Sequence, residues 1–243
     1  MWTRHFCNSV VRVLAKILLN LEAVGLENVP PEGPLILAIT HTNFLDPALA
    51  GAVMPRELVI MSKIENFRHP LFGIIARLYG AFPVHRGEVD RQAIRRSLDV
   101  LAGGQALLMA PEGTRSGHGQ LQEGHAGMTF IALRADAPIL PMAIIGGERF
   151  WANLSRLRRT PVKIVIGQAF RFSAGQKRAG REIMSKMTEE GMYQMASLLP
   201  PERRGVYSDL DSATEEYLAF PPGSSSNLPQ GEEGGGNRWP RAA

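Results

Sequence analysis

Short hydrophobic runs alternate along the chain with segments of helical periodicity. Strands are predicted where apolar and β-branched residues cluster between turn residues. The predicted strands are Pro34–Thr40, Leu58–Ser62, Phe82–His85, Ala106–Ala110, Ile139–Ile145 and Val162–Ile166. The predicted helices are Pro47–Val53, Pro70–Tyr79, Asp90–Ala102, Met128–Ala135 and Lys177–Leu198. This alternation predicts an α/β fold, a single domain over residues 23–200 whose mostly parallel or mixed sheet is flanked by helices.

The N-terminal stretch Arg4–Leu21 is apolar, but two cations interrupt it well before it reaches the ~18 apolar residues that a membrane-spanning helix needs. Polar side chains recur every four residues, at Arg4, Asn8, Arg12, Lys16 and Asn20. Residues 1–22 are therefore predicted to form an amphipathic helix with a narrow basic stripe, and we expect it to associate with membranes. The same pattern also fits a helix that packs on its own domain.

The end of the chain has a different composition. Two proline pairs, Pro200-Pro201 and Pro221-Pro222, precede runs of serine and glycine that cannot bury a core. Residues 201–243 are predicted to be a C-terminal extension, largely disordered beyond Phe220.

Charge narrows the choice of partners. The 243 residues carry a formal net charge of +4, which favours an anionic partner. Arginines and two aromatic residues gather in Arg149–Arg159, but no nucleic-acid-binding motif accompanies them, so we expect an anionic membrane surface and no nucleic acid. Cys7 is the only cysteine, which excludes an internal disulfide and a cysteine-rich metal site and favours a cytosolic location.

Candidate chemistry begins with a histidine followed five residues later by an aspartate, a pattern that occurs twice. In HRGEVD, Asp90 caps a well-formed helix, so a structural role accounts for its pairing with His85. In HTNFLDP, His41 and Asp46 lie where an apolar strand ends and Pro47 begins a helix, the position at which α/β proteins place ligands. We therefore expect His41 and Asp46 to be the functional pair, although Asp46 also fits a helix cap.

A histidine held by a carboxylate through one ring nitrogen presents the other nitrogen as a proton acceptor. Such a pair can activate a hydroxyl group that the substrate itself supplies, and no serine nucleophile is then required. The hydroxyl can attack a thioester directly while Asp46 stabilises the imidazolium form of His41.

The segment APEGTRS, residues 110–116, follows another apolar strand and so is predicted to lie at the same edge of the sheet. Gly113 permits a tight backbone, Thr114 offers a hydroxyl, and Arg115 supplies a planar group that matches phosphate oxygens. Anion binding is one interpretation of this loop, and a solvated turn is the other.

The ordered segments HTNFLDP, GAFPVHRG, APEGTRS and ILPMAI resemble the four sequence blocks of the glycerolipid acyltransferase family, particularly the 1-acylglycerol-3-phosphate acyltransferases. The resemblance covers roughly Val24–Gly167. It implies an α/β acyltransferase domain in which His41 is the base and Asp46 orients it. It further implies a site for the acceptor's phosphate and glycerol, formed by Arg86, Glu112, Gly113 and Arg115, with Lys63 nearby.

The resemblance also implies the partners. They are a lysophospholipid and an acyl thioester, carried by coenzyme A or by acyl carrier protein, with no metal and no cofactor. The expected location is the cytoplasmic face of the cell membrane, as a peripheral or monotopic protein. Three positions depart from the family pattern: Thr40 replaces an asparagine, Ala110 replaces a bulkier residue, and residues 121–124 lack a common lysine. The last departure leaves another acceptor open, such as glycerol 3-phosphate, another lysophospholipid or a lyso-aminolipid. A further alternative is a non-catalytic membrane lipid-binding module that attaches through the N-terminal helix and retains an acyltransferase-like pocket.

Overall fold

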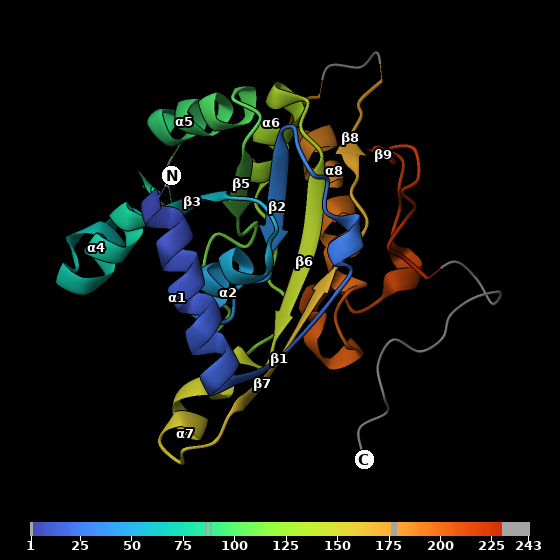
Figure 1. The fold of residues 1–243 in the computed structure, drawn as a ribbon. Helices are drawn as coiled ribbons and strands as arrows, with labels where there is room; N and C mark the ends of the chain where they lie inside the picture. The colour runs from blue at the N-terminus through green and yellow to red at the C-terminus, as the bar shows by residue number, and fades with distance from the viewer. Residues whose placement is uncertain (1, 86, 88, 176–178, 230–243) are drawn as a thin grey trace.

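The computed structural model describes residues 2–85, 87, 89–175 and 179–229, and its centre is a seven-stranded sheet (Figure 1). The strands run in the order β1-β7-β6-β2-β5-β3-β4, and every neighbouring pair is parallel except β6 and β7. They are β1 (Leu19–Val24), β2 (Leu35–Ile39), β3 (Leu58–Lys63), β4 (Phe82–Val84), β5 (Ala106–Met109), β6 (Ile139–Ile145) and β7 (Thr160–Ile166). The predicted fold class, an α/β domain with a mostly parallel sheet, is confirmed. All five side chains of β2 are buried, as its uninterrupted apolar sequence requires for a central strand.

Helices cover both faces of this sheet (Figure 1). One apolar cluster joins the sheet to α1, α2 and α7, and a second joins it to α5, α6 and α8. The helices are α1 (Trp2–Leu18), α2 (Asp46–Val53), α3 (Ile64–Arg68), α4 (Pro70–Leu78), α5 (Arg91–Ala102), α6 (Ala126–Ala135), α7 (Phe150–Leu154) and α8 (Arg181–Ala196). α8 begins later than the predicted Lys177, a residue that lies outside the described ones.

The N-terminal helix ends earlier than the predicted Leu21. The sequence LNLEAV alternates apolar and polar residues, and it forms β1, which pairs in parallel with β7 at the edge of the sheet. Glu22 forms an ion pair of 3.2 Å with Lys163 across this pair of strands. The predicted boundary after residue 22 therefore does not separate two units, because residues 19–24 belong to the sheet.

The side of α1 that packs on the domain is apolar: Ala15 is buried and Cys7, Val11 and Leu18 pack beside it, whereas Arg12 and Lys16 are exposed. The Arg12 side chain donates hydrogen bonds to the carbonyl oxygens of Ala52 and Met54, at 2.8 and 3.4 Å. These carbonyls lie at the C-terminal end of α2, where main-chain oxygens have no partner within the helix and attract cations. A second apolar side of α1 is turned outward, with Val10, Val13, Leu14 and Ile17 exposed. No helix in the described part of the chain is both long and apolar enough to cross a bilayer.

The C-terminal extension is ordered for longer than predicted. Residues 201–229 pack along α8 and add a short strand, β9 (Leu218–Ala219), which pairs with β8 (Arg171–Phe172). Asn227 is 7% exposed, accepts a hydrogen bond from the Gln168 N–H at 2.6 Å and donates one to the Gln194 side chain at 3.0 Å. The expectation of disorder beyond Phe220 is therefore wrong for residues 221–229, which the hydrogen bonds of Asn227 and the packing of Leu228 on the core hold in place. Residues 230–243 lie outside the described ones.

Candidate active site

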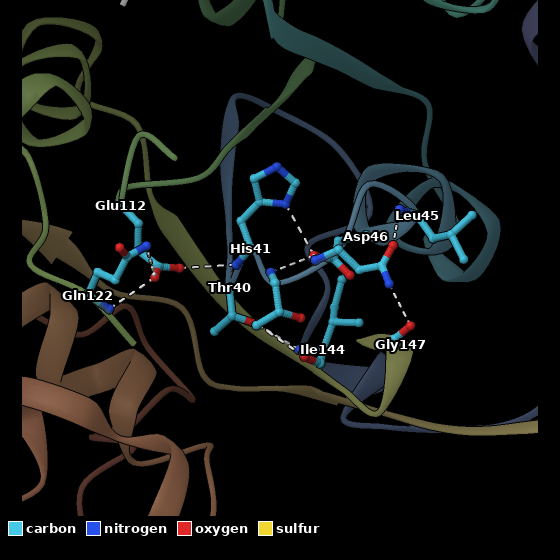
Figure 2. A network of polar contacts seen from close by, with 10 residues as sticks. Thr40, His41, Leu45, Asp46, Glu112, Gln122, Ile144 and Gly147 are labelled. Carbon is cyan, nitrogen blue, oxygen red and sulfur yellow. Dashed lines mark hydrogen bonds and ion pairs between the residues drawn. The ribbon is translucent and has the colours of Figure 1, made fainter. Parts of the chain in front are cut away.

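His41 lies two residues after the end of β2, in the turn that leads into α2. Its Nδ1 atom lies 3.1 Å from Oδ2 of Asp46, and its side chain is 12% exposed while that of Asp46 is completely buried. Figure 2 shows the imidazole projecting beyond the network of polar contacts that holds its main chain. Because Nδ1 faces the carboxylate, the other ring nitrogen is the one available to a substrate.

Asp46 holds the turn as well as the histidine. Its Oδ2 atom accepts hydrogen bonds from the main-chain N–H groups of Thr42 and Asn43, at 2.8 and 2.7 Å. Both donors precede Asp46, and no side-chain cap bonds to the first turn of α2. Asp46 therefore does not cap α2, the alternative role that the sequence left open. Its carboxylate instead closes the turn in which His41 lies.

Two neighbouring polar residues fix this turn on the sheet. Thr40 is buried, and its Oγ1 atom accepts a hydrogen bond of 2.9 Å from the N–H of Ile144 in β6 (Figure 2). The Asn43 amide donates to the carbonyl of Gly147 at 2.5 Å and accepts from the N–H of Leu45 at 3.1 Å. The motif residues on both sides of His41 thus anchor it to the loop after β6. Sequence reasoning missed Asn43, although its place inside HTNFLDP, as a short amide in a turn, was a usable signal.

The loop APEGTRS holds the main chain of His41 from the other side. One oxygen of Glu112 accepts from the His41 N–H at 3.0 Å, and its other oxygen accepts from the N–H of Gln122 at 3.0 Å. The N–H of Ser116 donates to the His41 carbonyl at 2.8 Å. The two separate motifs are therefore joined through one residue's backbone, and the position of His41 depends on both.

Glu112 is 2% exposed, and both of its oxygens bond to protein N–H groups. Burial raises the pKa of its carboxyl group, while the hydrogen bonds from Gln122 and His41 oppose that shift. Each oxygen of Glu112 is thus engaged by a main-chain N–H group, one of them that of His41. Its place in the acceptor's phosphate and glycerol site stays a prediction.

The other predicted binding residues have different surroundings. Gly113 adopts a positive φ of 66°, which favours glycine, and a Cβ atom there would lie 2.8 Å from the ring of His125. Thr114 and Arg115 are exposed, and Lys63 ends β3 half-buried. Arg86 lies outside the described residues.

A cavity of about 400 Å³, here called cavity I, is lined by His41 and by both described cations of the predicted site, Lys63 and Arg115. Its volume falls in the ~300–1,000 Å³ range of small-molecule sites. Apolar side chains from β3, α2 and α4 make up most of its wall, and Tyr79 lines it too. Its remaining lining residues are Phe44, Pro47, Ala48, Ile60, Met61, Ser62, Asn66, Ile75, Ala76, Ala81 and Trp151. An apolar cavity with cations near one histidine fits an amphiphile with an anionic head.

Tyr79 and Trp151 were not among the predicted site residues. Burial raises the pKa of Tyr79 to about 12, so its hydroxyl stays protonated in the wall of the cavity. Trp151 stacks on Phe44 with ring centroids 5.8 Å apart. Neither residue belongs to a sequence motif of the site, and only the folded chain brings them to His41.

The second histidine–aspartate pair, His85 and Asp90, has a similar contact distance but is more exposed to solvent. Nδ1 of His85 lies 2.9 Å from Oδ2 of Asp90, but the His85 side chain is 49% exposed. Asp90 accepts hydrogen bonds from the N–H groups of Gln92 and Ala93 as the N-cap of α5, as predicted. These bonds, with that from the His85 N–H, lower the pKa of Asp90 to about 2. The sequence-based assignment of Asp90 to helix capping is confirmed.

Comparisons with known proteins show which family the chain resembles. A family model described as Acyltransferase matches residues 20–145. The chain is 24% identical over 185 residues to a 1-acyl-sn-glycerol-3-phosphate acyltransferase of Bacillus subtilis, covering 76% of this chain and 90% of the relative. It is 33% identical over 144 residues to a lyso-ornithine lipid O-acyltransferase of Pseudomonas aeruginosa, covering 53% of this chain and 55% of that protein.

The fold is similar to a solved structure as well. The crystal structure of the 1-acyl-sn-glycerophosphate (LPA) acyltransferase PlsC from Thermotoga maritima matches with a TM-score of 0.58 and 22% identity, over 77% of each chain. The family model covers more than half of the 243 residues. This chain therefore belongs to the acyltransferase family and is an O-acyltransferase.

Proposed function

We propose that the protein transfers a fatty acyl group from an acyl thioester to the sn-2 hydroxyl of 1-acylglycerol 3-phosphate, giving phosphatidic acid. The observation that carries this proposal is that His41 lines cavity I together with Lys63 and Arg115. The two cations match a phosphate monoester, and the apolar wall matches the acyl chain of a lysolipid. The name of the Bacillus subtilis relative supports the same acceptor.

In the proposed reaction His41 acts as the general base. Its free ring nitrogen takes the proton of the acceptor hydroxyl while the oxygen attacks the thioester carbonyl. The new carbon–oxygen bond forms, the carbon–sulfur bond breaks, and the imidazolium returns the proton to the departing thiolate. Asp46 stabilises the imidazolium between these steps, as its contact with Nδ1 at 3.1 Å supports.

Thiol release from acyl-CoA in the presence of the lysolipid tests the dyad. His41→Ala is expected to lower turnover by about 10²-fold or more, the range for loss of a general base. His85→Ala is the matched control, because that histidine has the same spacing to its aspartate but is half-exposed. Equal turnover by His41→Ala and the unsubstituted enzyme refutes the dyad.

A second acceptor class deserves a direct comparison, because one relative is named for a lyso-ornithine lipid. If the acceptor is phosphorylated, Arg115→Ala raises its KM by about 10-fold or more, as expected for loss of a charge-assisted contact. The same substitution then leaves the KM of an unphosphorylated acceptor nearly unchanged. Preferred transfer to the ornithine lipid, with no selective effect of Arg115→Ala, rejects phosphatidic acid as the product.

We further propose that the enzyme attaches to an anionic membrane surface from the cytoplasmic side. The outward apolar face of α1 supports this, because Val13 and Ile17 are 57% and 61% exposed. Val13→Ser with Ile17→Ser is expected to weaken binding to vesicles that contain anionic lipid. Ser185→Ala on α8, far along the chain from α1, serves as the control. Undiminished vesicle binding by the double variant rejects α1 as the anchor.

A further inference from the structure

His41 lies between two cavities. The second, cavity II, has a volume of about 160 Å³ and shares His41, Pro47 and Met61 with cavity I. The reaction needs two substrates whose reacting atoms meet at one ring nitrogen, so two cavities that meet at His41 correspond to two substrates. Cavity II is smaller than the ~300–1,000 Å³ of a complete small-molecule site, so it suits one segment of a longer molecule.

The walls of the two cavities differ in charge. Lys63 and Arg115 line cavity I, whereas the described residues that line cavity II include no lysine or arginine. Cavity II is bounded mainly by apolar side chains such as Ile39, Leu108 and Met128, and its polar groups are two imidazoles. An uncharged segment fits this wall better than a phosphate does.

The second imidazole belongs to His125, which no sequence motif of the site includes. Its main-chain N–H donates to the Pro111 carbonyl at 2.9 Å, which ties it to the loop that holds His41. Its ring lies so close to Gly113 that a Cβ atom at that glycine would be 2.8 Å from Cδ2. The positive φ of Gly113 and the absence of a side chain there thus make the space in which His125 lies.

On this basis we propose that cavity II binds the end of the thioester donor next to the sulfur, and that His125 hydrogen-bonds an amide of its pantetheine arm. This inference rests on the proposed function. The pantetheine arm is uncharged, contains amide groups and is common to coenzyme A and acyl carrier protein, so the same contact serves either donor. His125 is a substrate-binding residue in this assignment, while His41 transfers the proton.

The first experiment separates donor from acceptor. With the purified full-length enzyme in detergent micelles or vesicles, His125→Ala is expected to raise the KM for acyl-CoA by about 3- to 10-fold, the effect of one neutral hydrogen bond. The KM for the lysolipid and kcat should stay within about twofold, since the base and the cations of cavity I are untouched. His118→Ala is the matched control, because His118 lies in the same region and lines neither cavity.

The second experiment identifies the contacted group. The effect of His125→Ala should be equal for acyl-CoA and for S-acyl-pantetheine. The effect of His125→Ala should disappear for an acyl thioester of mercaptoethanol, which lacks both amides of the pantetheine arm. Without an amide on the donor, His125 has no partner whose hydrogen bond the substitution could remove. Comparison of acyl-CoA with acyl carrier protein then shows which source the enzyme prefers without changing the assignment.

A filling substitution tests the cavity without removing a hydrogen bond. A Cβ atom at Gly127, in the first turn of α6, meets nothing within 4 Å, and this residue lines cavity II. Gly127→Leu is expected to lower kcat/KM for the donor by about 10-fold or more, because displaced reacting atoms lose rate steeply. Gly127→Ala, with the smallest side chain, is the paired control, and thermal melting verifies that both variants fold.

Some outcomes overturn the assignment while leaving the proposed function intact. A rise in the lysolipid KM alone places the acceptor in cavity II. Unchanged donor constants in both His125→Ala and Gly127→Leu mean that cavity II holds neither substrate. The proposed function itself fails in a different way, through undiminished transfer by His41→Ala or through the absence of lysolipid-dependent thiol release.

Discussion

Glu112→Gln tests the difference between positioning the base and binding the acceptor. In the enzyme one carboxylate oxygen accepts from the His41 N–H and the other from the Gln122 N–H, both at 3.0 Å. Glutamine has the same shape, but it turns an NH₂ group toward one of these two donors. One hydrogen bond is lost, and a buried main-chain N–H is left facing another donor.

The magnitude follows from those contacts. A hydrogen bond to a charged group contributes about 1.5–3 kcal/mol, and an unpaired buried donor costs a similar amount. We therefore expect Glu112→Gln to lower the free energy of unfolding by about 2–4 kcal/mol. For a chain of this length each kcal/mol corresponds to a Tm decrease of about 2–4 °C. The melting temperature should fall by roughly 4–16 °C on the same scale.

The turnover of Glu112→Gln should fall together with its stability. Because Glu112 supports the backbone of His41, kcat should decrease by about 10-fold or more, since a small misplacement of a base is costly. The KM values of phosphorylated and unphosphorylated acceptors should change by the same factor. Circular dichroism melts and initial rates with both acceptors measure these quantities. Gln122→Ala is the comparison, because it keeps the main-chain N–H and removes only the longer side-chain bond of 3.4 Å to Glu112.

An opposite pattern refutes the positioning role. If Glu112→Gln leaves Tm unchanged and raises the KM of the phosphorylated acceptor alone, the side chain contacts the substrate. The family resemblance would then describe Glu112 better than the hydrogen bonds of the folded chain do.

Three further substitutions test the surroundings of the site. Asp46→Asn keeps an acceptor for Thr42 and Asn43 but removes the charge beside His41, so kcat should fall by about 10²–10⁴-fold, and near-normal kcat contradicts the orienting role. Thr40→Val leaves the Ile144 N–H unpaired and should cost about 1–3 kcal/mol of stability, seen as a lower Tm, whereas an unchanged Tm means another partner replaces it. Asp90→Ala removes the cap of α5 and should cost about 0.5–2 kcal/mol in urea unfolding. The folded-state pKa of Asp90, about 2, lies below its ordinary value of 3.8. The stability difference between Asp90→Ala and the unsubstituted protein should therefore have its full size above pH ~5 and shrink as pH falls from ~4 toward 2. A difference of undiminished size at pH 2 contradicts the assignment.

Much of the sheet could be predicted because its central strands are buried on both faces. LILAI of β2 and ALLM of β5 contain no polar residue, and no amphipathic helix presents such a run. β1 was missed because LNLEAV continues the apolar composition of α1 and becomes a strand only by pairing with β7. Tertiary pairing, and not local preference, decides the state of such a segment.

The direction in which α1 faces could not be predicted either. Its periodicity establishes two sides, but it does not state which side the domain covers. Long-range contacts settle it: Ala15, with Cys7, Val11 and Leu18 beside it, packs on the core, and Arg12 bonds to carbonyl oxygens at the end of α2, forty or more residues away in sequence. Arg12 and Lys16 stay exposed, and Val10, Val13, Leu14 and Ile17 form a second apolar side that is left outside.

The two histidine–aspartate pairs show why spacing identifies candidates but not function. Their Nδ1–Oδ2 distances are 3.1 and 2.9 Å, so contact geometry does not separate them. Burial does: His41 is 12% exposed and lines two cavities, whereas His85 is 49% exposed. Water competes for the free nitrogen of an exposed imidazole, while a substrate hydroxyl in a cavity has that nitrogen as its nearest acceptor. The burial of His41 comes from Asp46, Glu112 and Ser116 folding around its backbone, and that arrangement, rather than the five-residue spacing, makes one of two similar pairs suited to proton transfer.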